Sequence, residues 1–129
     1  MFTVEQIKNA HSKVQSGADF PAYIQELKAL GVITYDTFVH DGHADYHGVE
    51  GYTVSSSPLY DHLPIAAEVN QTQFAADLLA HQQGKTDYLQ FCQDVASNGV
   101  SKWIVDLTAM TCTYIDLKGQ AVLSEAIPV

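Results

Sequence analysis

The stretch from His40 to His47 holds the densest group of side chains that could bind a metal ion. Its sequence, HDGHADYH, places three histidines and two aspartates within eight residues. Imidazole and carboxylate groups bind zinc and similar divalent metals when three or four of them converge. Five residues are therefore candidate metal ligands: His40, Asp41, His43, Asp45 and His47.

The same stretch is also typical of a β-hairpin. The dipeptide Asp41-Gly42 is a strong turn signal. Because every second side chain of a strand shares a face, we expect His43, Asp45 and His47 on one face, with His40 approaching across the turn. The alternative is a solvated turn, since hairpin tips collect Asp, Gly and His for turn geometry alone and the spacing fits no strong zinc motif.

Other residues that could do chemistry are weaker candidates. His11 and His81 occupy apolar faces of two matching helices, which is typical of histidines at the edge of a core. Glu68 and Glu125 occupy related positions and could act as general acid and base, or each could simply point outward from a strand. No complete catalytic set, phosphate-binding glycine loop or dinucleotide fingerprint is present, so catalytic residues stay unassigned.

The elements that must position these side chains follow one pattern twice. Two amphipathic helices are expected before Gly31, and two more before Gly99. At an offset of 68 positions, Gly31-Val32 matches Gly99-Val100, and Tyr35 matches Trp103. After each glycine–valine pair the apolar period changes from about 3.6 to 2, which indicates strands.

We therefore interpret the chain as an internal duplication within a single domain, residues 1–129. One pseudo-repeat covers residues 3–69 and the other covers 70–127, with the last strands at 65–69 and about 120–127. The predicted fold is α+β, in which duplicated α-α-β-β-β units form an antiparallel sheet of about six strands with four helices packed on one face. The alternative is chance similarity between two pairs of amphipathic helices.

Composition argues against some classes of partner. The chain has 15 acidic and 6 basic residues, a formal net charge of −9, and every basic residue is lysine. An acidic chain without arginine repels phosphate backbones and lacks the usual bidentate donor, which argues against nucleic acid. No apolar run approaches the roughly 18 residues of a membrane span, and the first residues lack the features of a signal peptide. We therefore expect no membrane partner and a cytoplasmic location.

The two cysteines, Cys92 and Cys112, do not form a CxxC pair. Without support for an oxidising compartment, we expect buried free thiols rather than a disulfide.

Several short motifs together resemble one known family. They are the helix ending in Gly31-Val32, the Asp41-Gly42 turn, the Tyr46-x-Gly48 step, and Gly99-Val100-x-x-Trp103-x-x-Asp106 followed by Thr113-Tyr114. This pattern resembles the YbcV-like proteins, small bacterial and prophage-associated proteins of unknown function. The resemblance implies a bacterial cytosolic or prophage origin and transfers no catalytic residue. Some members are labelled "phage envelope protein", which nothing in this sequence supports.

Three functions fit these observations. The first is a non-enzymatic binding or interaction module for a protein or a small-molecule ligand, because one sheet face is left half exposed. The alternative is a metal-dependent enzyme using the hairpin at 40–47, in which His40, His43 and His47 bind a divalent metal while Asp41 or Asp45 orients an imidazole or activates water. The third is self-association into a homo-oligomer, because edge strands need protection.

Overall fold

A computed structural model describes residues 2–14 and 19–127 of the chain. Two helices and three strands are followed by two more helices and three more strands, and the strands form one antiparallel sheet in the order β3-β2-β1-β4-β5-β6. The predicted α+β fold with a six-stranded antiparallel sheet is confirmed. The elements are α1 (Val4–His11), α2 (Phe20–Leu30), β1 (Thr34–Phe38), β2 (Ala44–His47), the short 3-10 helix η2 (Val49–Gly51), β3 (Thr53–Ser55), α3 (Gln71–Gln82), α4 (Tyr88–Ser97), β4 (Val100–Asp106), β5 (Thr111–Asp116) and β6 (Ala121–Ala126).

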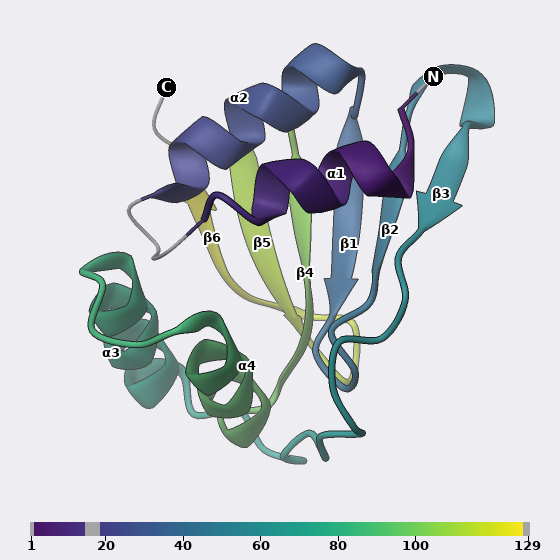
Figure 1. Ribbon diagram of the computed structural model, residues 1–129. Helices are drawn as coiled ribbons and strands as arrows, with labels where there is room; N and C mark the ends of the chain where they lie inside the picture. Colours follow the sequence, from purple (N-terminus) through teal and green to yellow (C-terminus); the bar gives the residue numbers. More distant parts are fainter. Residues whose placement is uncertain (1, 15–18, 128–129) are drawn as a thin grey trace.

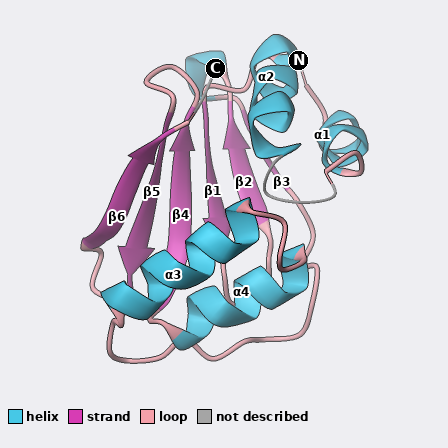
Figure 2. Ribbon diagram, turned by 90° about the vertical axis from the view of Figure 1, so that its left-hand side faces the viewer, coloured by secondary structure: helices cyan, strands magenta, loops and turns pink. Residues whose placement is uncertain are grey.

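The helices form two hairpins that lie on the same face of the sheet. In Figure 1, α1 and α2 cross in front of the upper part of the strands, and α3 and α4 lie at the lower left, beside the other end of the strands. Figure 2, turned by 90°, shows all four on one side of the strands. The predicted packing of four helices on one face is therefore confirmed. None of the helices in the described residues is both long and apolar enough to cross a bilayer.

Side chains and glycines set the ends of the helices. The Thr3 hydroxyl accepts from the backbone N–H of Gln6, whose side chain accepts from the backbone N–H of Thr3, so the N-terminus of α1 is a complete capping box. Asn70 caps α3 by accepting from the backbone N–H of Gln73, and Asp87 caps α4 by accepting from that of Gln90. Gly31 ends α2 at a φ of +103°, a left-handed conformation that costs glycine little.

The core lies between the sheet and the helices. On the strands, buried side chains alternate with partly exposed ones, as in Tyr35 and Thr37 of β1 and in Cys112 and Tyr114 of β5. This period of two matches the predicted half-buried sheet. Both thiols, Cys92 and Cys112, are free and buried, which confirms that expectation.

The predicted last strand of the first unit, at residues 65–69, is wrong. The third strand is β3 (Thr53–Ser55), and residues 56–70, which we call the connector, run from β3 to α3. The backbone N–H of Ala66 donates to the Ala96 carbonyl, and that of Asn70 donates to the Asn98 carbonyl. Because this segment hydrogen-bonds to the end of α4, it does not join the edge of the sheet.

With β3 placed correctly, the α-helices and strands of the two halves correspond one to one. Each element of the second half begins 66 to 68 residues after its counterpart, from Val4 and Gln71 in the first helices to Thr53 and Ala121 in the last strands. The sheet order is also symmetric about the β1–β4 pairing. The internal duplication stays a prediction, which this repeated spacing supports.

Candidate functional site

A cavity of about 560 Å³ lies between the inner face of the sheet and the two helical hairpins. This volume falls in the range of sites that hold small organic molecules. All four helices and strands from both halves of the chain contribute to its wall. Eight of the lining side chains are aromatic, namely Phe20, Tyr23, Tyr35, Tyr46, Tyr88, Phe91, Trp103 and Tyr114.

The sheet register creates the aromatic floor of this cavity. Tyr35 on β1 lies directly opposite Tyr46 on β2, with ring centroids 5.2 Å apart. Trp103 on β4 lies opposite Tyr114 on β5, with ring centroids 6.1 Å apart. Cross-strand neighbours share a face, so each half contributes one aromatic pair at the corresponding position.

Two histidines complete the wall from the helices. His11 of α1 packs edge-on against Tyr23 and Tyr88, at 5.3 Å from each ring. His81 of α3 stacks on Phe91 at 4.2 Å, and its Nδ1 lies 3.1 Å from the Thr86 carbonyl oxygen. A carbonyl only accepts, so Nδ1 carries the hydrogen and Nε2 stays an acceptor. Burial lowers the pKa of both imidazoles, which favours their neutral form.

Glu125 is the acidic side chain in the wall of the cavity. It lies on β6 opposite the buried Cys112, and the side-chain amide of Gln82 donates to its Oε1 at 2.8 Å. Burial raises the pKa of this carboxyl group. The interpretation that Glu125 points outward is therefore wrong, and Glu68, its expected partner in acid–base chemistry, is exposed in the connector.

Most of the remaining polar groups of the cavity are uncharged. Burial raises the pKa of the Cys112 thiol to about 12, so it is protonated at neutral pH. Burial and a hydrogen bond to Tyr46 raise the pKa of Tyr23. The ammonium group in the lining belongs to Lys8, an exposed residue of α1. The cavity therefore presents mostly aromatic surface with a few neutral hydrogen-bonding groups, beside the carboxyl group of Glu125 and the exposed ammonium group of Lys8.

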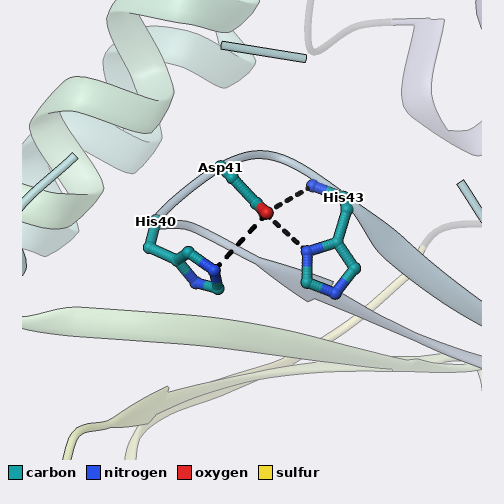
Figure 3. A group of neighbouring side chains, drawn as sticks. All are labelled: His40, Asp41 and His43. Carbon is teal, nitrogen blue, oxygen red and sulfur yellow. Dashed lines mark hydrogen bonds and ion pairs between the residues drawn. The ribbon is translucent and has the colours of Figure 1, made fainter. Parts of the chain in front are cut away.

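Three of the five predicted metal ligands lie together at the turn between β1 and β2. Figure 3 shows His40 and His43 pointing at the Asp41 carboxylate from either side. His43 Nδ1 lies 2.5 Å from Asp41 Oδ1, and His40 Nε2 lies 3.4 Å from Asp41 Oδ2. Burial alone raises the pKa of Asp41, but hydrogen bonds from His43 outweigh it and lower the pKa. The carboxylate is therefore ionised at neutral pH.

This cluster lies outside the cavity, on the face of the sheet without helices. The His43 ring stacks on Phe38 at 4.5 Å, and the Phe38 position alternates with the inward-facing Thr37. The structure thus separates the two groups of residues that could carry a function.

The other two predicted ligands lie apart from the cluster. Asp45 Oδ1 accepts a hydrogen bond from Ser55 Oγ on β3 at 2.7 Å. His47 Nδ1 lies 3.0 Å from Thr53 Oγ1, and its Nε2 lies 3.8 Å from Asp36 Oδ2. Because β2 lies between β1 and β3, these side chains pair with their cross-strand neighbours instead of with His43.

Sequence reasoning assigned the cavity residues to the core and missed the cavity itself. One signal was available: the aromatic residues recur at the repeat offset, since Tyr35 corresponds to Trp103 and Tyr46 to Tyr114. Tyrosine in place of aliphatic residues at repeated core positions indicates a wall with polar groups that need partners.

The fold and cavity define an α+β protein in which two helical hairpins and a six-stranded sheet surround an aromatic site. The chain belongs to the family described as "Protein of unknown function (DUF1398)", whose model matches residues 8–126. It is 28% identical over 102 residues to uncharacterised proteins of Mycobacterium bovis (Mb2035) and Mycobacterium tuberculosis (Rv2012). These matches cover 78% of this chain and 62% of each relative, so the chain spans less than two thirds of their length.

Proposed function

We propose that this chain is a non-enzymatic binding module that holds a small, uncharged, largely aromatic organic molecule in its cavity. The observation that carries the proposal is the 560 Å³ space lined by eight aromatic side chains from both halves of the chain. Aromatic walls bind planar apolar molecules by stacking and by removing their surface from water. A few polar groups within such a wall orient the bound molecule.

The charge of the wall favours an uncharged occupant. His11 and His81 are held neutral by burial, and the Cys112 thiol stays protonated. Two ionisable groups of ordinary charge line the cavity: the ammonium group of the exposed Lys8 and the carboxyl group of Glu125, whose pKa is raised by burial. The chain contains no arginine, so an organic anion would find one exposed cation and an acidic group in the wall. The Nε2 of His81 and the hydroxyl groups of the tyrosines offer hydrogen bonds that do not require a charged ligand.

The state of the same groups supports binding over catalysis. A protonated thiol is a poor nucleophile, and the pKa of Cys112 lies far above neutral pH.

The proposal is tested by titrating the full chain with the neutral fluorophore N-phenyl-1-naphthylamine. We expect saturable binding of one molecule per chain and quenching of Trp103, the sole tryptophan, which lies in the cavity wall. The anionic analogue 1-anilinonaphthalene-8-sulfonate is expected to bind more weakly, because the cationic partner in the lining is the exposed Lys8 and the wall also holds the carboxyl group of Glu125.

A pair of adjacent leucines on α3 provides matched variants. Leu78 lines the cavity and is 5% exposed, whereas Leu79 is 54% exposed on the outside of the same helix. We expect Leu78→Phe to fill part of the cavity and weaken fluorophore binding about tenfold, a loss of about 1.4 kcal/mol, while Leu79→Phe leaves binding unchanged. Equal effects of the two substitutions, with circular dichroism showing both variants folded, would contradict binding in the cavity.

We infer that the chain is a YbcV-like protein of bacterial or prophage origin that arose by internal duplication. The short motifs around Gly31, Gly99 and Trp103 support the first inference, and the bacterial source of the two relatives agrees with it. The common spacing of 66 to 68 residues between counterpart elements supports the second.

A further inference from the structure

We propose that His40, Asp41 and His43 form a binding site for a divalent transition metal ion of the zinc type. The site lies on the helix-free face of the sheet, so it is separate from the cavity and does not rest on the function proposed for it.

The positions of the donor atoms carry the proposal. One ring nitrogen from each histidine and one carboxylate oxygen of Asp41 lie within 4.8 Å of one another. In a tetrahedral zinc site with bonds of about 2.0–2.2 Å, ligand atoms are separated by roughly 3.3–3.6 Å. Small side-chain rotations therefore bring all three donors to one ion. Imidazole and carboxylate donors without a thiolate suit Zn²⁺, Co²⁺ and Ni²⁺.

The backbone that carries these donors is held in place by the connector. The backbone N–H of Leu63 donates to the His40 carbonyl at 2.7 Å, and that of Leu59 donates to the Asp41 carbonyl at 2.8 Å. Gly42 adopts a φ of +77°, and a Cβ at this position would lie 2.7 Å from the Tyr60 ring. A turn fixed in this way presents its ligands without a large ordering cost on binding.

Turn geometry alone does not explain these side chains. The corresponding turn of the second half, residues 108–111, has the sequence Thr-Ala-Met-Thr. Met110 occupies the position of Gly42 and adopts the same left-handed conformation, with a φ of +55°. This second turn is held instead by Asp106 at the end of β4, whose carboxylate accepts from the backbone N–H groups of Thr108 and Ala109. Residues 108–111 themselves carry no histidine or aspartate, so the donors at His40, Asp41 and His43 have no counterparts in the second half.

The site is open to solvent, and further ligands are available. His40 lies at the edge of a shallow depression of about 520 Å³, which His62 also lines. The ring of His62, from the connector, lies 5.7 Å from that of His40. Water or this third imidazole can complete the coordination of an ion that enters through the depression.

The test uses the full chain, purified without a histidine tag and stripped of metal. Titration with Co²⁺ is followed by its visible absorbance, and Zn²⁺ is then added to displace it. We expect one Co²⁺ per chain, with binding weakened at least tenfold by His40→Ala, His43→Ala and Asp41→Asn. Asp41→Asn retains an oxygen that can accept from the His43 backbone N–H, so the turn is preserved.

His47→Ala is the matched control, because this histidine lies on the same face but contacts Thr53 and Asp36. It should leave Co²⁺ binding unchanged. Circular dichroism checks that each variant is folded, and the half-exposed His40 also accepts the milder His40→Gln. The proposal is overturned by a lack of saturable binding, by folded His40 and His43 variants that bind as tightly as the parent, or by an equal loss in His47→Ala.

Discussion

His11 and His81 place neutral imidazoles in the cavity wall. Each ring packs against aromatic neighbours, and burial lowers the pKa of each. Because the pKa of each ring is lower in the folded chain than in the unfolded chain, the free energy of unfolding depends on pH.

The pH dependence has a defined sign. Below an ordinary histidine pKa of about 6.5, the unfolded chain binds protons at these two rings that the folded chain does not. The free energy of unfolding should therefore fall as the pH is lowered from about 7 to 5.5. The raised pKa of Glu125 has the opposite effect on stability. As the pH falls, this carboxyl group binds its proton in the folded chain before it does so in the unfolded chain, which raises the free energy of unfolding.

Urea unfolding at several pH values checks this expectation. The double variant His11→Gln/His81→Gln should show a shallower loss of stability between pH 7 and 5.5. Circular dichroism at each pH checks that the parent and the double variant both start from the folded state. An unchanged slope in the double variant would show that the two rings do not carry the effect.

Residue-level prediction from sequence succeeded where local spacing decides the outcome. The turn at Asp41-Gly42 follows from residue type, and it brings His40 and His43 to the same carboxylate. The hydrogen-bond partners of Asp45 and His47 could not be predicted, because Ser55 and Thr53 lie on β3, which the sequence reasoning placed at residues 65–69. Whether the cluster binds metal stays a prediction.

Glu125 shows a different limit of sequence reasoning. The pairing of β5 and β6 changes register between Tyr114 and Ile115. Such an irregularity changes which side chains face the core. A strict alternation counted along the sequence does not reveal it.

At the scale of elements, α4 ends at Gly99, a position where the surrounding atoms leave no space for a side chain. Gly99 adopts a φ of +86°, and a Cβ there would lie 2.5 Å from the Glu68 carbonyl oxygen in the connector. Gly119, in the turn between β5 and β6, has a similar φ of +82° but no atom within 4 Å of such a Cβ.

The two glycines allow backbone strain to be separated from steric exclusion. Gly119→Ala should lower the free energy of unfolding by about 1–2 kcal/mol, the cost of a left-handed alanine. Gly99→Ala should cost more, because the connector must also move away from the new methyl group. Urea denaturation of both variants measures the difference, and equal losses would show that the contact with Glu68 is unimportant.

Element boundaries were predictable where caps and periodicity agreed. The capping box at Thr3 and the helix end at Gly31 were confirmed, and the change of period after each glycine–valine pair located β1 and β4. The strand expected at 65–69 was wrong because its apolar pattern resembles that of β6, while its backbone groups bond to the end of α4. Hydrogen bonds between backbone groups far apart in the chain do not depend on the local residue pattern, so the sequence did not predict them.

For the whole molecule, the excess of negative charge should oppose the compact state. With a formal net charge of −9, mutual repulsion is strong at low ionic strength, where the screening length is about 30 Å at 0.01 M salt. Raising NaCl from 0.01 to 0.15 M at pH 7 should increase the melting temperature by a few degrees. KCl should give the same result in thermal unfolding followed by circular dichroism, and a constant or falling melting temperature would contradict repulsion as the cause.

The connector has a consequence for communication between the two faces of the sheet. Leu59 contributes to the cavity wall, and its backbone N–H also holds the Asp41 carbonyl. A ligand in the cavity that displaces Leu59 would therefore alter the free energy of metal binding at Asp41. Thermodynamic reciprocity then requires the influence to be equal in both directions, so a ligand that tightens metal binding is itself bound more tightly in the presence of metal.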